Sequence, residues 1–139
     1  MILVSSSFAF IGLVNGLAQL LLFALVVCLP IWRTGRMSYV DIGWPWGLVL
    51  MALLAYGFSD GYWLRSLLIS LLLAVVGLRM GIGALNFWRR GLLQKEFPRY
   101  QYLRVRWQAE GKSNVGLALQ VDAISQGLAN ASFLALPIF

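Results

Sequence analysis

Histidine is absent from this 139-residue chain, and cysteine occurs once, as Cys28. Without histidine, acid–base catalysis by imidazole, histidine-ligated haem and the usual zinc sites are excluded. A single cysteine can form neither an internal disulfide nor a cysteine metal cluster. We therefore expect no metal site in this chain.

Charged residues are also scarce, because they make up 12% of the chain while hydrophobic residues make up 60%. A soluble domain carries about 25% charged residues. The apolar residues gather in long runs, which indicates an integral membrane protein whose surroundings are the lipid bilayer. The formal net charge is +6. In a membrane protein this excess is typical of loops that face the anionic cytoplasmic leaflet, so no nucleic acid is expected as a partner.

Four apolar runs predict an all-α bundle of four transmembrane helices, at about 8–32, 44–58, 62–88 and 115–138. We treat residues 1–139 as one membrane domain. The second run spans roughly 22 Å as a helix, which is short for a crossing, and we expect it to extend back toward Tyr39. Pro45 suits the first turn of that helix. Asp41 either caps the helix start or has a functional role at the membrane edge.

Nine of the eleven Lys and Arg residues lie in two segments, 33–42 and 89–112. The positive-inside rule places both segments in the cytoplasm and both termini outside, in a multi-pass membrane protein. The second segment interleaves aromatic residues with its arginines. We expect this cytoplasmic basic segment between helices three and four to lie on the membrane surface or to fold against the bundle.

Polar and small residues inside the helices predict helix contacts. Asn15 and Gln19 are one turn apart, so they share a face and favour interhelical hydrogen bonds. Two small-xxx-small pairs allow another helix to approach closely, from this chain, from a second half or from another copy in a homo-oligomer. These pairs are Gly12 with Gly16 and Gly77 with Gly81.

Arg79 lies roughly 13 Å inside the third predicted helix, with Asn86 on the same face. A charge at that depth costs about 2.5–3.5 kcal/mol on insertion scales, so Arg79 either snorkels, pairs within the bundle or contacts a ligand. Asp122, Gln126 and Asn130 are spaced by four and form one polar stripe. Asp122 lies roughly 10 Å deep. Our hypothesis is that Asp122 pairs with Arg79 or faces the same wet cavity.

A series of short motifs resembles the uncharacterised bacterial membrane proteins of the steroid 5-alpha-reductase superfamily. The order and spacing carry the resemblance, since each motif alone is weak. The motifs are Ser38-Tyr39-Val40-Asp41 with Gly43-Trp44, Gly77-Leu78-Arg79, Arg89, Glu96-x-Pro98-Arg99-Tyr100 with Leu103-Arg104, Gln126-Gly127 and Leu136-Pro137.

The resemblance implies a multi-helix enzyme of the bacterial inner membrane that uses NADPH to reduce a carbon–carbon double bond conjugated to a carbonyl, or a sterol double bond, in a lipophilic substrate. The cofactor would lie within the bundle, open to the cytoplasm, with arginines neutralising its phosphates. A polar side chain in the pocket would polarise the carbonyl of the lipophilic substrate. The candidates are Arg79, Arg89, Arg99 and Arg104 for the cofactor, and Asp41, Glu96 and Tyr100 for catalysis.

Two positions depart from the family pattern: Phe97 stands where an acidic residue is usual, and Val76 stands where tryptophan is common. The resemblance covers the amino-terminal half of a typical family member, and we expect the chain to be truncated and inactive unless a second half is supplied. The alternative is a non-enzymatic four-helix scaffold or assembly subunit. A small exporter is disfavoured, because the first helix has no acidic residue to couple protons. The substrate stays open.

Overall fold

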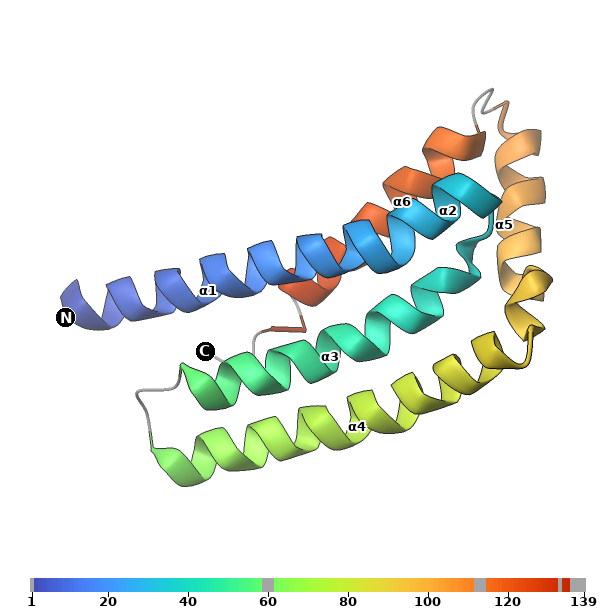
Figure 1. Ribbon diagram of the computed structural model, residues 1–139. Helices are drawn as coiled ribbons and strands as arrows, with labels where there is room; N and C mark the ends of the chain where they lie inside the picture. Colours follow the sequence, from blue (N-terminus) through green and yellow to red (C-terminus); the bar gives the residue numbers. More distant parts are fainter. Residues whose placement is uncertain (1, 59–61, 112–114, 133, 136–139) are drawn as a thin grey trace.

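A computed structural model of the chain describes residues 2–58, 62–111, 115–132, 134 and 135. Its described part is all-helical. Long helices run side by side, and a shorter one stands across one end (Figure 1). In chain order the elements are α1 (Ile2–Phe23), η1 (Ala24–Cys28), α2 (Leu29–Thr34), η2 (Met37–Tyr39), α3 (Val40–Gly57), α4 (Trp63–Arg89), η3 (Leu92–Gln94), α5 (Pro98–Ala109) and α6 (Val115–Ala131).

Three segments of the described chain are long and apolar enough to cross a membrane: Ala9–Thr34, Met37–Gly57 and Trp63–Arg89. They coincide with the first three predicted helices, and the chain is a membrane protein of several helices. The expected extension of the second helix back toward Tyr39 is confirmed, because α3 begins at Val40. Pro45 therefore lies inside α3, and the prediction that it occupies the first turn is wrong.

The fourth predicted helix corresponds to α6, which has 17 residues and ends at Ala131. It is not among the segments long and apolar enough to cross a membrane. The predicted stretch 136–138 lies outside the described residues. A fourth crossing and an external location of both termini therefore stay predictions.

The first helix buries one residue in every four from Ile11 to Ile31. The members of this stripe are Ile11, Asn15, Gln19, Phe23, Val27 and Ile31, each at most 9% exposed. An α-helix has 3.6 residues per turn, so steps of four drift by about 40° each. The π-helical turn η1 interrupts the helix at Ala24–Cys28, and its wider turn takes up part of this drift. In addition, the Cys28 carbonyl accepts a hydrogen bond of 3.0 Å from Gln120 Nε2 on α6.

Helices α3 and α4 pack closely because glycine faces α3 at two points. A Cβ at Gly77 would lie 2.8 Å from the carbonyl oxygen of Pro45 and 3.0 Å from the backbone nitrogen of Val49. A Cβ at Gly81 would lie 3.1 Å from Nε1 of Trp46. The close approach predicted at Gly77 and Gly81 is thus made within the chain.

At the other glycine pair, a Cβ at Gly16 would have no neighbour within 4 Å. Assembly through Gly12 and Gly16 stays a prediction.

Buried amide side chains join α1 to α3 and α6. Gln19 Nε2 donates to the Gly47 carbonyl at 2.9 Å and to Asn15 Oδ1 at 3.4 Å. Asn130 Nδ2 donates to the carbonyl of Trp44 at 3.3 Å. Asn15, Gln19 and Asn130 are each 0% exposed. Hydrogen bonding of these amide nitrogens lowers the cost of burying them inside a bundle, whereas Gln19 Oε1 and Asn130 Oδ1 are buried without a partner among the described residues. The interhelical bond predicted for Gln19 is confirmed.

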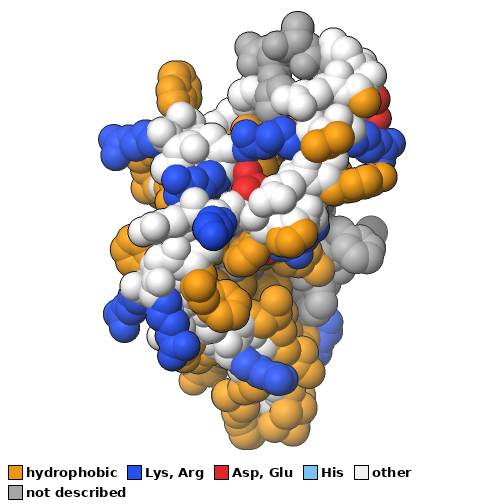
Figure 2. All heavy atoms as spheres, turned by 90° about the vertical axis from the view of Figure 1, so that its right-hand side faces the viewer, with side chains coloured by type: hydrophobic (Ala, Val, Ile, Leu, Met, Phe, Trp, Pro, Cys, Tyr) orange, Lys and Arg blue, Asp and Glu red, His pale blue; other side chains and the backbone are white. Residues whose placement is uncertain are grey.

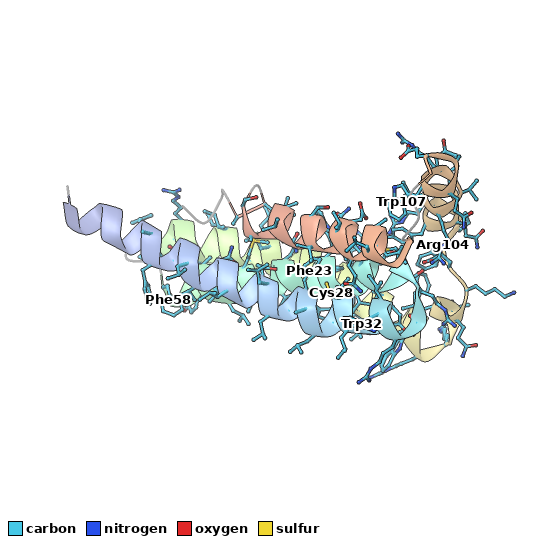
Figure 3. All side chains as sticks on the ribbon, turned by 90° about the horizontal axis from the view of Figure 1, so that it is seen from above. Phe23, Cys28, Trp32, Phe58, Arg104 and Trp107 are labelled. Carbon is cyan, nitrogen blue, oxygen red and sulfur yellow. The ribbon has the colours of Figure 1, made fainter. Side chains whose placement is uncertain are left out.

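Helix α5 stands across the end of the bundle where α2, the start of α3 and the end of α4 meet (Figures 1 and 3). Tyr100 and Trp107 anchor it, since both are buried in a core cluster with Phe23, Val27 and Leu119. The predicted basic segment therefore folds against the bundle. Arg36 Nη1 donates to the Leu93 carbonyl at 3.3 Å and Arg104 donates to that of Gly35, so the two basic segments are in contact. Lys and Arg side chains are spread over this end of the molecule (Figure 2).

Candidate functional site

Glu96 ties the loop before α3 to the start of α5. Its Oε1 accepts hydrogen bonds from the backbone nitrogen and the hydroxyl of Ser38, both at 3.2 Å. Its Oε2 lies 2.7 Å from Arg104 Nη2, which also donates to the carbonyl of Gly35. Only 11% of the Glu96 side chain is exposed. Glu96 and Arg104 are therefore occupied in holding two segments together, which leaves them little capacity for a substrate or a cofactor.

Asp41, Arg99 and Tyr100 form a second polar cluster at the same end. The Arg99 guanidinium donates to Asp41 Oδ1 and, at 2.9 Å, to the Tyr100 hydroxyl. The hydroxyl donates in turn to Asp41 Oδ1 at 3.3 Å. The guanidinium carbon also lies 4.6 Å from the centre of the Tyr100 ring, within cation–π range. No side-chain hydrogen bond caps α3, so the interpretation of Asp41 as a helix cap is wrong.

The hydroxyl of Tyr100 stays protonated at neutral pH. Burial raises the pKa of this group above its ordinary value of 10.0, and the negative charges of Asp122 and Glu96 raise it further, while Arg99 lowers it. A neutral hydroxyl can donate its proton in a hydrogen bond. Tyr100 is therefore a donor at this site.

A cavity of about 530 Å³ adjoins this cluster, between the start of α3, the second half of α4 and the start of α5. Asp41, Arg79 and Arg99 line it. The rest of the lining is largely apolar and includes Met80, Gly83, Phe87, Leu93 and Phe97. A cavity of this size, mostly apolar with a few charged groups, is the usual form of a small-molecule site.

Arg79 and Asp122 are not brought together. Asp122 is not among the residues that line the cavity with Arg79. The ion pairs of the described residues are Arg99–Asp41, Arg104–Glu96 and Arg106–Glu110. Arg79 and Asp122 therefore form no ion pair with each other, and this part of the hypothesis is wrong. The alternative, that the two side chains face one wet cavity, stays a prediction.

The other predicted site residues are spread over the molecule. Arg89 and Asn86 are exposed on α4 and do not line the cavity. Gln126 accepts a hydrogen bond of 2.9 Å from Trp44 Nε1, and Asn130 belongs to the buried amide network. These two residues stabilise the packing of α6 on α3.

Sequence reasoning missed Ser38, whose hydroxyl is fully buried beside Glu96 and accepts a hydrogen bond of 3.3 Å from the Phe97 backbone. Its place in the Ser38–Asp41 motif was the available signal. It also missed the apolar wall of the cavity formed by Phe87 and Phe97. Phe87 was indistinguishable from a lipid-facing residue in the sequence, and the position of Phe97 in the basic segment did not indicate which helices it contacts.

Residues 29–139 match a family model described as "Protein of unknown function (DUF1295)". No curated protein matches the chain, and no solved structure does.

Proposed function

The chain belongs to the DUF1295 family of proteins of unknown function, and from this premise we propose that its cavity binds the phosphates of NADPH in a reductase of steroid 5-alpha-reductase type. The assignment as a reductase follows from the resemblance of the sequence motifs. The observation that supports it is the pair of arginines, Arg79 and Arg99, at one largely apolar cavity.

The residues present fit a phosphate-bearing group. A guanidinium presents several donors in a planar fork that matches phosphate oxygens, and two of them face the same space. Of the four arginines that the resemblance suggested, Arg79 and Arg99 would hold the phosphates, whereas Arg104 is bound to Glu96 and Arg89 lies elsewhere. NADPH, when bound, supplies a hydride.

The catalytic candidates are narrowed by the same geometry. Asp41 lines the cavity, and Tyr100 adjoins it through its hydrogen bond to Asp41. A protonated tyrosine hydroxyl suits the polarisation of a substrate carbonyl. Glu96 is the weakest candidate, because both its carboxylate oxygens are engaged by Ser38 and Arg104.

The test is an equilibrium titration of NADPH into the purified protein in a non-ionic detergent. We expect saturable binding that Arg79→Ala weakens by about 10-fold to 100-fold, since hydrogen bonds to charged groups contribute about 1.5–3 kcal/mol. Gly83→Leu should also weaken binding without removing a charge. A Cβ at Gly83 has no neighbour within 4 Å, so a longer side chain can extend into the cavity.

Arg89→Ala is the matched control, because it removes an arginine of α4 that does not line the cavity. The affinity of this variant for NADPH should equal that of the unaltered protein. A folded protein that shows no saturable NADPH binding would contradict the proposal and favour a non-enzymatic scaffold. Equal losses in Arg79→Ala and Arg89→Ala would indicate nonspecific attraction to a basic surface instead.

A further inference from the structure

The two arginines of the cavity differ in how they are paired. Arg99 contacts Asp41 and Tyr100, whereas Arg79 takes part in no ion pair among the described residues. Arg79 lies within the Trp63–Arg89 segment, where an uncompensated charge is costly. An anionic group that enters the cavity is therefore drawn first toward Arg79.

Any such anion also meets Asp41, which lines the same cavity with its own negative charge. Like charges at close range repel, and both groups compete for the guanidinium of Arg99. The Asp41–Arg99 pair can give way, because its side chains are 29% and 60% exposed and ion pairs exposed to this degree contribute little.

We propose that Asp41 is an internal competitor for the anion site, holding Arg99 until the phosphate group of a ligand displaces it. The ligand class is a phosphate attached to an apolar body, since the cavity that holds the charged side chains is otherwise lined largely by apolar residues such as Met80, Phe87 and Phe97. This inference rests on the cavity of the proposed function, but it depends on the phosphate and not on the nicotinamide ring.

Tyr100 has a defined part in this exchange. Its ring lies under the Arg99 guanidinium, and its hydroxyl accepts a hydrogen bond from it at 2.9 Å. The hydroxyl also donates to Asp41 Oδ1, whereas the ring contact does not involve Asp41. The ring contact therefore keeps Arg99 at the edge of the cavity when its ion pair opens. Tyr100 is thus a positioning residue for the arginine that receives the phosphate.

The experiment measures the affinity of two probes, NADPH and decyl phosphate, for the protein in a non-ionic detergent. Decyl phosphate represents a lipid-like phosphate, so the two arms distinguish a nucleotide from a lipid. The Asp41→Asn variant should bind NADPH or decyl phosphate, whichever the unaltered protein binds, about two- to fivefold more tightly than the unaltered protein does. This is the scale expected for releasing a partly exposed ion pair. Its melting temperature reports whether the variant is folded, and Asp41→Ser replaces it if it is not.

Asp122→Asn is the matched control. It removes the same charge from a residue close enough to influence the pKa of Tyr100, yet Asp122 does not line the cavity. Its affinity should be unchanged. If Asp122→Asn tightened binding as much as Asp41→Asn, the effect would come from net charge and the competitor role would be lost.

The remaining outcomes separate this inference from the proposed function. Binding of decyl phosphate alone, tightened by Asp41→Asn, would support the competitor role and overturn the NADPH assignment. Binding of NADPH that Asp41→Asn leaves equal or weaker would overturn the competitor role alone. Failure of both probes to bind the folded protein would overturn both.

Discussion

Gly77→Val is expected to force α3 and α4 apart and to lower the free energy of unfolding by about 3 kcal/mol, because overpacking a tight contact is costly. Two of the three nearest atoms that its Cβ would meet are backbone atoms, the carbonyl oxygen of Pro45 at 2.8 Å and the nitrogen of Val49 at 3.0 Å, and the third is Cγ2 of Val49 at 2.8 Å. Backbone of a neighbouring helix cannot rotate aside as a side chain can. Reversible unfolding in mixed micelles, followed by tryptophan fluorescence, measures the change.

Gly83→Val provides the comparison on the same helix. It makes the same chemical change at a position where a Cβ has no neighbour within 4 Å. Intrinsic helix propensity should change similarly in both variants, so the difference between them isolates the helix contact. Equal stabilities would show that α3 and α4 do not depend on the glycine contact.

Glu96→Ala is expected to lower the free energy of unfolding by about 2–3 kcal/mol, because it leaves a partly buried guanidinium without its carboxylate. Arg104, the partner, is 35% exposed, so water relieves part of the cost. The variant also removes the acceptor of two hydrogen bonds from Ser38. Protease accessibility of the 35–39 connection between α2 and α3 should rise together with the loss of stability.

Two further variants separate the contribution of the Glu96 charge from that of its hydrogen bonds and compare it with an exposed ion pair. Glu96→Gln keeps an acceptor for Ser38 but removes the charge, so its loss should be smaller than that of the alanine variant. Glu110→Ala breaks the pair between Arg106 and Glu110, whose side chains are 61% and 42% exposed, and should change stability by less than about 0.5 kcal/mol. If Glu96→Ala were as mild as Glu110→Ala, Glu96 would not hold the two segments together.

Periodicity and depth along the helices were enough to predict the membrane-spanning segments and several contacts between them. The spacing of Asn15 and Gln19 indicated a polar face, and Gln19 does bond to α3. The Gly77-x-x-x-Gly81 pattern indicated a close helix neighbour, which is α3. Such features repeat at regular intervals within one helix, so a sequence displays them directly.

Contacts between side chains of different segments were harder to predict, because depth along a helix does not give the direction in which a side chain points. Arg79 and Asp122 have similar calculated depths but form no ion pair with each other. The ion pair that does form joins Asp41 to Arg99, 58 residues away, and depends on how α5 lies across the bundle end. The helical nature of the 98–109 segment was not predicted, since its arginines and aromatic residues show no clear apolar face.

The π-helical turn η1 has a consequence for changes in the length of the first helix. The buried stripe continues through it with steps of four residues, at Gln19, Phe23, Val27 and Ile31. Removing one residue within Ala24–Cys28 would shorten one of the two four-residue steps between Phe23 and Ile31 to three residues. A plain α-helix keeps buried residues that are spaced by three and four on one face. The same deletion within 16–22 would instead rotate everything before it by about 100°. The turn is thus the place in this helix where a one-residue deletion is expected to leave the packing of both halves intact.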